Sequence, residues 1–481
     1  MLSRTVQRSL EATRAVLDAM YAAGGAPYVA GPGRLADLSR AQWFLWAGAG
    51  LTAAEVSGRA FSGASSSASS PRTLALGTVA ADLYLGYVAL RERSRLFSGL
   101  VTDQDWELQH RRGATRVLDA AETLGGVLIK AGQFASTRPD LLPSAYTETL
   151  TSLQDRVPPQ PPAMIREAVA RELGHPTEDI FSSFDPEPVA AASIAQVHRA
   201  RLRDGTEVAV KVQYPNISGL IDADLDALET IFGAVAGLEP DIRLRPISDY
   251  LRWTLPLELD FVREAEAIGA LREALADRDD VIVPDVIKGL TTERLLVMTF
   301  VEGIKITDVE GLKRAGVEPR EVATLLNDVY AEQLFARSVL HADPHPGNLL
   351  VRSEGGRPHL VLLDHGLTLG LDTGFVSALG RLVHALEVGD LTEISACLGD
   401  AGLPVGEDTD LESLLAIVGV MLGGERQDSV PRGFGLGASI GDIPPKLLLV
   451  GRAIGLLEGI TRQLDPDLDA LKIVGRHLRA P

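Results

Sequence analysis

Three short polar motifs constrain this chain more than its overall composition does. The first is VAVKV at residues 208–212, where strand alternation puts three valines on one face and Lys211 on the other. The second is the Pro- and Gly-stiffened loop HADPHPGN at residues 341–348. The third is the apolar run 360–363, which ends in DHG at residues 364–366. Their order is a strand lysine, then Asp-x4-Asn, then a strand-terminal Asp-x-Gly.

Each motif has a use in phosphoryl transfer. A lysine held on a strand can reach nucleotide phosphates as a fixed point charge. In the loop, Asp343 can accept the proton of a phosphoryl acceptor, and the amide oxygen of Asn348 can ligate magnesium. Asp364, with Gly366 allowing the chain to turn, can bridge metal and phosphate. A solvated lysine and an ordinary turn remain the alternatives for each motif alone. Together they follow the order of protein-kinase-like phosphotransferases.

An acidic cluster precedes the loop and could supply the carboxylate that such a lysine requires. It lies in LELDFVREAEA at residues 257–267. On one continuous helix, Asp260 and Glu264 would be i,i+4 neighbours, while Glu258 and Glu264 would lie on different faces. A solvated acidic helix face is the alternative interpretation.

Two common phosphate-binding loops are missing from the sequence. There is no G-x-x-x-x-G-K-[ST] motif and no G-x-G-x-x-G ahead of Lys211. Residues 190–196 (AAASIAQ) take the place of the G-x-G-x-x-G loop. Their small side chains still let the backbone approach phosphates, but alanine disfavours the positive φ that glycine allows. A plain helical or loop segment is the alternative.

The pattern of elements predicts a small β-rich lobe followed by a helical lobe. A Gly/Ser-rich linker at 63–71 precedes a helical region over 103–153, and four prolines at 158–162 mark a boundary. An Asp-Gly turn at 204–205 joins two strands. The expected strands are 197–202, 207–212, 291–300 and 360–363, and the expected helices are 164–173, 221–238, 322–340 and several after 373.

Composition excludes several classes of protein. Lys plus Arg is 46 and Asp plus Glu is 65, which gives a net charge of −19 and argues against nucleic acid as a partner. The single cysteine, Cys397, excludes an internal disulfide framework and a thiolate zinc cluster. The most apolar segment, 74–90, carries Asp82 at its middle and is interpreted as a buried or surface helix rather than a membrane span.

In addition to these patterns, the chain resembles the UbiB/AarF family of atypical kinases, which is tied to isoprenoid-quinone biosynthesis. The resemblance covers about residues 106–466. The family's K-x-G-Q appears as KAGQ at 130–133 and its E-x-D as ELD at 258–260. The other matching motifs are the alanine-rich loop 190–196, the strand lysine, the loop 341–348 and DHG at 364–366, with His365 where phenylalanine is usual.

The resemblance implies roles for individual residues. Lys211 would bind the α and β phosphates of ATP and pair with Glu264. Asp343 would be the counterpart of the catalytic aspartate, and Asn348 and Asp364 would hold Mg²⁺. Lys130 and Gln133 would lie on a helix that folds over the active site, with Lys130 near Glu258. The implied nucleotide-binding loop comprises Ala190, Ala191, Ala192, Ser193, Ile194, Ala195 and Gln196.

Taken together, these inferences predict an α+β, protein-kinase-like bilobal fold. The expected parts are an Ala/Gly/Ser-rich region (1–100), the K-x-G-Q helical extension (101–160), a β-rich N-lobe (161–303) and a helical C-lobe (304–481). The expected ligands are ATP, Mg²⁺ and a small or lipid-like acceptor. We expect a cytoplasmic protein, with peripheral membrane contact and import into a mitochondrion or plastid as alternatives.

Two functions from other classes compete with a kinase or ATPase. A metallohydrolase would use His341, Asp343 and His345 as an H-x-D-x-H ligand set. That interpretation leaves Lys211 and the acidic cluster unexplained. A nucleotide-sensing pseudokinase scaffold would bind ATP without turnover.

Overall fold

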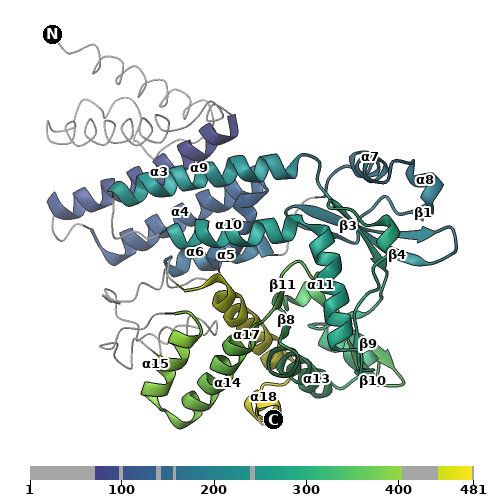
Figure 1. The fold of residues 1–481 in the computed structure, drawn as a ribbon. Helices are drawn as coiled ribbons and strands as arrows, with labels where there is room; N and C mark the ends of the chain where they lie inside the picture. Colours follow the sequence, from purple (N-terminus) through teal and green to yellow (C-terminus); the bar gives the residue numbers. More distant parts are fainter. Residues whose placement is uncertain are drawn as a thin grey trace. The chain divides into compact units, whose positions relative to one another are not determined.

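The computed structural model describes residues 71–96, 101–136, 142–154, 159–238, 244–403 and 443–478. Figure 1 traces the chain with the element labels used below. The chain divides into two compact units, each of which is described by itself. The first unit comprises residues 1–136, 141–154 and 219–248, and the second comprises 137–140, 155–218 and 249–481.

The first unit is helical where it is described, as predicted for residues 103–153. It contains α3 (Pro71–Leu96), α4 (Asp103–Leu124), α5 (Val127–Ser136), α6 (Ser144–Leu150) and most of α9 (Ile217–Leu238). A capping box starts α4, because Thr102 and Asp105 each bond the other's backbone N–H. Arg72 then ties α3 to α9 through Asp224, with Nε–Oδ1 at 2.6 Å, and also donates to the Gly125 carbonyl.

An antiparallel sheet forms the N-lobe of the second unit. Its strands run in the order β1-β3-β4-β6, with β2 added to β3. The predicted hairpin is confirmed: β3 and β4 pair across the Asp204-Gly205 turn, where Gly205 has φ +94°. The strands are β1 (Phe181–Phe184), β2 (Ala190–Ala191), β3 (Ala195–Leu202), β4 (Glu207–Gln213) and β6 (Leu295–Thr299).

The core of the N-lobe lies between this sheet and helix α7 (Pro162–Leu173). The strand alternation behaves as predicted, because the three valines of residues 208–212 all enter this core and Lys211 faces the other side. Ile165 and Val169 of α7 are fully buried against them. Each buried side chain of this size contributes about 1.5–3 kcal/mol. The next helix, α8 (Thr177–Ile180), leads into β1.

The C-lobe of the same unit combines helices with two small sheets. One sheet has the order β5-β10-β9-β7, and the other pairs β8 with β11. The strands are β5 (Val281–Ile282), β7 (Ile304–Lys305), β8 (Val339–His341), β9 (Leu349–Glu354), β10 (Arg357–Leu362) and β11 (Thr368–Gly370). The helices are α12 (Val309–Arg314), α13 (Pro319–Ala331), α14 (Thr373–Val388), α15 (Leu391–Asp400), α17 (Pro445–Leu464) and α18 (Ala470–Leu478).

Three boundaries predicted from the sequence are wrong. The acidic cluster spans two helices, α10 (Arg245–Leu259) and α11 (Phe261–Ala274), because Asp260 leaves the helix to cap α11. The helix expected over 322–340 stops earlier, since a π-helical turn (Glu332–Ala336) leads into β8, whose pairing with β11 outweighs helix propensity. The strand expected over 291–300 is limited to Leu295–Thr299, where pairing with β4 begins.

Some expectations fall outside the described residues. They concern the first fifty residues and the part of the Gly/Ser-rich linker up to residue 70. The apolar segment 74–90 lies within α3, and Asp82 at its middle contacts Arg116 at 3.1 Å. Among the helices of the described ranges, none combines the length and the apolar character that a bilayer span requires.

Truncating the α7 side of the N-lobe core should destabilise the protein. We expect Ile165→Ala to lower the free energy of unfolding by about 2–5 kcal/mol, because it leaves a cavity at a side chain with no solvent exposure. Urea titration followed by circular dichroism measures the change. Val189→Ala is the control, because Val189 is 58% exposed and its loss should cost less than about 0.5 kcal/mol. Equal midpoints for the two variants would contradict this account of the core.

The cysteine provides a pH-dependent test of burial. Cys397 lies fully buried in α15, and burial, followed by the hydrogen bond to Glu393, raises the pKa of its thiol to about 11. Because the thiolate is the reactive form, native protein should react slowly with a maleimide at pH 7.5 and faster as the pH approaches 11. Urea should bring the rate at pH 7.5 to that of a free thiol. Fast labelling of the native protein at pH 7.5 would show that Cys397 is accessible.

Candidate active site

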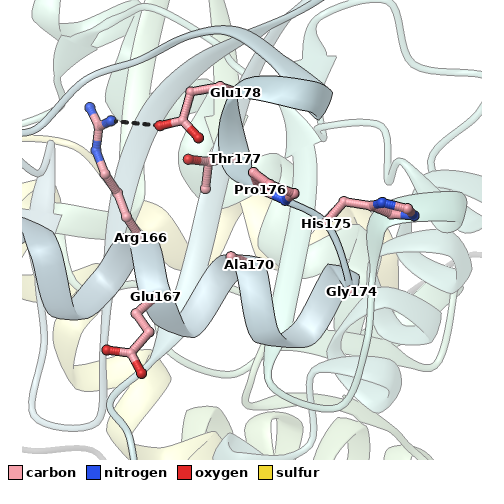
Figure 2. Close-up of a pocket in the computed structure, with 8 residues that line it drawn as sticks. All are labelled: Arg166, Glu167, Ala170, Gly174, His175, Pro176, Thr177 and Glu178. Carbon is pink, nitrogen blue, oxygen red and sulfur yellow. Dashed lines mark hydrogen bonds and ion pairs between the residues drawn. The ribbon is translucent and has the colours of Figure 1, made fainter.

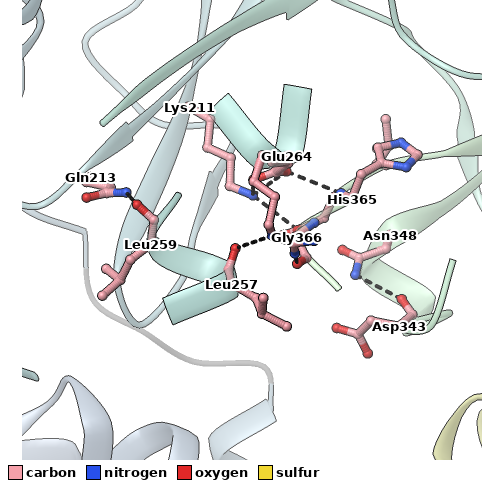
Figure 3. Close-up of polar contacts among 12 residues, drawn as sticks. Lys211, Gln213, Leu257, Leu259, Glu264, Asp343, Asn348, His365 and Gly366 are labelled. Atoms are coloured by element: carbon pink, nitrogen blue, oxygen red, sulfur yellow. Dashed lines mark hydrogen bonds and ion pairs between the residues drawn. The ribbon is translucent and has the colours of Figure 1, made fainter. Parts of the chain in front are cut away.

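Lys211 forms the centre of a charged cluster in the second unit (Figure 3). Its Nζ lies 2.8 Å and 2.9 Å from the two carboxylate oxygens of Glu264, and 3.1 Å from Oδ1 of Asp364. The side chain of Lys211 is 10% exposed and that of Glu264 is 1% exposed, whereas Asp364 is 45% exposed. The structure therefore brings together three residues separated by up to 153 positions, as the sequence predicted.

The charges of this cluster support one another despite their burial. Burial alone would lower the pKa of the Lys211 ammonium, but Asp364 and Glu264 reverse the effect and hold it above its ordinary value. Burial pulls the pKa of Glu264 upward, while Lys211 opposes this. Two hydrogen bonds from Lys211 and one from the His365 N–H, at 3.2 Å, favour the ionised carboxylate. The ammonium and these hydrogen bonds counteract the burial, which on balance still leaves the pKa of the Glu264 carboxyl above its ordinary value.

Glu264 owes its position to the start of α11. Asp260 caps the helix by accepting from the Arg263 N–H at 2.9 Å, which sets Glu264 in the first turn, facing inward. Gln213, two residues after Lys211, donates to the Leu259 carbonyl and so fixes the junction of the two helices beside β4 (Figure 3). The lysine and its carboxylate partner are thus held by the same local contacts.

Asp364 adopts a conformation that few residues other than glycine tolerate. Its φ is +56°, in the left-handed region. Neighbouring groups hold it there. Gly366 N–H donates to Asp364 Oδ1 at 3.3 Å, and Arg263 donates to the Gly366 carbonyl. A strained residue held by its surroundings is typical of functional sites.

His341 supports the same segment from the other side. Its Nε2 lies 2.9 Å from the carbonyl oxygens of both Leu363 and Asp364, so Nε2 carries the proton and donates. Nδ1 must then accept from the Tyr330 hydroxyl, which is 2.9 Å away. Burial and then the Asp343 charge raise the pKa of Tyr330 well above its ordinary value, so it stays protonated. His341 is therefore a positioning residue for Asp364.

These bonds argue against the metallohydrolase interpretation. Both ring nitrogens of His341 are occupied by Tyr330 and by backbone carbonyls, so His341 has no lone pair left to bind a metal beside Asp343 and His345. Within the described ranges, no three His, Cys, Asp or Glu side chains are grouped as metal ligands. Neighbouring His365 is fully buried, and burial lowers its pKa to about 3, so this ring is neutral.

Asp343 and Asn348 lie together on the loop that follows β8. The Asn348 amide nitrogen donates to the Asp343 carbonyl at 3.2 Å, which turns the amide oxygen to the opposite side (Figure 3). The Leu363 N–H donates to the Asn348 carbonyl at 2.8 Å and so sets Asn348 beside the Asp364 segment. An amide oxygen and a carboxylate on adjacent segments are the oxygen ligands that Mg²⁺ prefers. These residues fit the predicted metal role, which stays a prediction.

The alanine-rich loop is a tight β-hairpin rather than a helix. β2 pairs with β3, and Ala192 N–H donates to the Ala195 carbonyl at 2.8 Å to close the turn. Gln196 does not present its side chain to a ligand. It is 1% exposed, accepts from the Gln160 N–H at 2.8 Å and contacts His198 Nε2 at 2.8 Å. Any nucleotide contact by Gln196 is thus left to its backbone, and the role of the loop stays a prediction.

The remaining predicted residues are divided between the two units. Lys130 and Gln133 lie on α5 of the first unit, where Gln133 donates to the Leu153 carbonyl at 2.9 Å. Glu258 lies at the end of α10 in the second unit. The predicted proximity of Lys130 and Glu258 therefore stays a prediction.

Sequence reasoning missed Arg452. This residue lies on α17, and its Nη2 donates to Oδ1 of Asp343 at 2.8 Å. No motif surrounds it, and 109 residues separate it from Asp343. Only the isolated basic charge in an otherwise apolar stretch of the helix, LLLVGRAIGLL, could have drawn attention to it.

A cavity of about 480 Å³ lies elsewhere in the N-lobe, at the connection between α7 and α8 (Figure 2). Its walls are a different set of residues from those around Lys211, and an ion pair between Arg166 and Glu178 at 3.2 Å spans part of it. The lining residues are Arg166, Glu167, Ala170, Gly174, His175, Pro176, Thr177 and Glu178.

Comparison with known proteins agrees with the geometry. The model of the ABC1 atypical kinase-like domain matches residues 152–398, about half of the chain, and this range includes Lys211, Glu264 and Asp364. The chain belongs to this family. The likeness to atypical kinases inferred from the motifs is thereby confirmed.

Several relatives of this ABC1 chain are named as kinases. It is 36% identical over 331 residues to AarF domain-containing protein kinase 1 of Mus musculus, which covers 68% of this chain and 61% of the mouse protein. It is 40% identical over 274 residues to the probable protein kinase UbiB of Aeromonas salmonicida, covering 56% of this chain and 49% of that protein. The chain thus spans about half to three fifths of these relatives.

A solved structure also confirms the kinase-like α+β fold. The Mycobacterium tuberculosis protein Rv3197, in its complex with erythromycin, is 26% identical and superposes with a TM-score of 0.51. The match covers 76% of this chain and 95% of Rv3197.

Removing the charge of Glu264 tests the ion pair directly. We expect Glu264→Gln to lower the free energy of unfolding by about 3 kcal/mol, because the buried ammonium would keep only the half-exposed Asp364 as a partner. Urea titration measures the loss. Glu266→Gln is the matched control: it lies two residues along the same helix, is exposed, and should change stability by less than about 0.5 kcal/mol. A Glu264→Gln protein as stable as wild type would show that the pair is not needed.

Proposed function

We propose that this chain is an Mg²⁺-dependent ATP-binding enzyme that hydrolyses ATP or transfers its γ-phosphoryl group to a small or lipid-like acceptor. The observation that carries the proposal is the bridge from Lys211 to Glu264 and Asp364. This is the arrangement in which a kinase-like lysine is held ready for phosphates beside a metal-binding aspartate. Membership of the ABC1 family and the kinase names of relatives support it.

Each residue has a defined part in the reaction. Lys211 would bind the α and β phosphates of ATP, with Glu264 fixing its direction. Asn348 and Asp364 would hold Mg²⁺, which supplies charge neutralisation of the phosphates. The backbone of the 190–196 hairpin would approach the phosphates from the N-lobe.

Asp343 would act on the acceptor. The acceptor oxygen forms a bond to the γ-phosphorus, and the bond from that phosphorus to the β–γ bridging oxygen breaks. The proton of the acceptor hydroxyl passes to the Asp343 carboxylate, and ADP leaves with the bond's electron pair. With water as the acceptor the same steps give hydrolysis.

The acceptor class rests on the family resemblance. We infer a role in isoprenoid-quinone or membrane-lipid metabolism, supported by the relative named UbiB. ATP turnover measured with and without a quinone-like phenol or lipid vesicles tests this role. Stimulation by either one supports the inference, and turnover that neither changes argues against it.

Neutralising Asp364 should separate an enzyme from a scaffold. We expect Asp364→Asn to lower Mg²⁺-dependent ATP turnover at least about 100-fold, because a metal-binding charge is lost, while the fold survives at this half-exposed site. Phosphate release measures turnover. Asp279→Asn is the control: Asp279 lies on the exposed surface, and this variant should turn over ATP at the wild-type rate. ATP binding without turnover in the wild type would instead identify a nucleotide-sensing pseudokinase.

A further inference from the structure

Arg452 occupies a position beside the candidate catalytic carboxylate that the reaction described above does not use. It projects from α17, a helix that packs on α13 of the C-lobe. Its Nη2 donates to Asp343 Oδ1 at 2.8 Å, and its Nη1 lies 3.4 Å from the Tyr250 hydroxyl. The side chain is 26% exposed and that of Asp343 is 20% exposed. All three residues belong to the second unit.

The hydrogen bonds of this guanidinium leave donors unused. Arginine has five N–H donors in a planar fork. In Arg452 the hydrogen bond to Asp343 is of ordinary length and the one to Tyr250 is long. Nε is buried and has no hydrogen-bond partner. Buried donors are nearly always paired in native structures. The guanidinium is therefore under-satisfied, and the exposed quarter of its side chain can take an anionic oxygen ligand in addition to Asp343.

The charge at this position is maintained. Burial would lower the pKa of Arg452, but the nearby Asp343, the Tyr250 hydroxyl and Glu258 hold it above its ordinary value. A permanent cation is thus placed next to the carboxylate that would receive the acceptor's proton.

Phosphoryl transfer gains from a second cation here, in addition to the Mg²⁺ that Asn348 and Asp364 would hold. Negative charge spreads over the three outer oxygens of the phosphoryl group during transfer, and Asp343 and Asp364 are both acidic. The loop 341–348 contains no lysine or arginine. Lys211 is already held by two carboxylates. Arginine suits the task, because its fork matches the oxygens of a phosphoryl group.

We propose that Arg452 is a further substrate-binding residue, which takes the oxygens of the γ-phosphoryl group while Asp343 holds its guanidinium in place. The proposal rests on the proposed function, since it assigns a group of the same site. The Nη groups donate to the phosphoryl oxygens, and the Nη2 bond keeps Asp343 oriented toward the incoming hydroxyl.

Nucleotides that differ only in the γ-phosphoryl group test this role. Affinities for ADP and for a non-hydrolysable ATP analogue, both with Mg²⁺, are measured by calorimetry on wild type, Arg452→Lys and Arg452→Gln. We expect Arg452→Gln to bind the ATP analogue about 10-fold or more weakly and ADP within about 2-fold of wild type, the size expected for one charge-assisted hydrogen bond. The affinity of Arg452→Lys for the ATP analogue should lie between those of the wild type and Arg452→Gln.

Arg462→Gln is the matched control. It lies on the same helix, is 72% exposed and pairs with Glu458 one turn away, so it should bind both nucleotides as wild type does. Equal losses for ADP and the ATP analogue in Arg452→Gln would assign Arg452 a purely structural role and overturn the proposal. Unchanged affinities would overturn it as well.

Inorganic phosphate separates this proposal from the proposed function. At constant ionic strength, phosphate should raise the melting temperature of the wild type and of Arg462→Gln but not that of Arg452→Gln. If the wild type binds no nucleotide yet shows this difference, the proposed function fails and the anion site at Arg452 stands. If phosphate stabilises all three proteins alike, or none, the assignment of Arg452 fails, whatever the nucleotide result.

Discussion

The ammonium of Lys211, shared between two carboxylates, is the interaction on which the rest of the site depends. A buried lysine is costly unless it is paired, and here the pairing joins three segments: strand β4, helix α11 and the turn after β10. The cap at Asp260, the Arg263 bond to Gly366 and the His341 bonds to the chain at Asp364 all fix partners of this lysine. The strained φ of Asp364 is maintained by the same contacts.

The residues of the charged centre could be predicted because local patterns place them. Alternation in VAVKV puts the valines in the core and Lys211 on the other face, and an Asp-Gly pair specifies the turn before it. The strand before Asp364 ends in a plain apolar run, LVL at 360–362. Such alternation is a reliable guide to the structure, because the burial of one face of a strand fixes which side chains lie on each face.

The features that were missed depend on tertiary contacts. The break at Asp260 separates Glu258 from Glu264, and β8 forms only because β11 lies beside it, neither of which propensity shows. Gln196 has the polarity of a ligand-binding residue, yet it serves a buried network with His198. Arg452 lies 109 positions from Asp343, and only the packing of α17 brings them together.

The most direct test of the central claim is a crystal structure with a non-hydrolysable ATP analogue and Mn²⁺ in place of Mg²⁺. The account predicts an anomalous manganese peak within coordination distance of Asn348 and Asp364, and α and β phosphate oxygens within hydrogen-bond distance of Lys211 Nζ. Nucleotide bound elsewhere, with Lys211 still enclosed by Glu264 and Asp364 and no metal at Asp364, would contradict it.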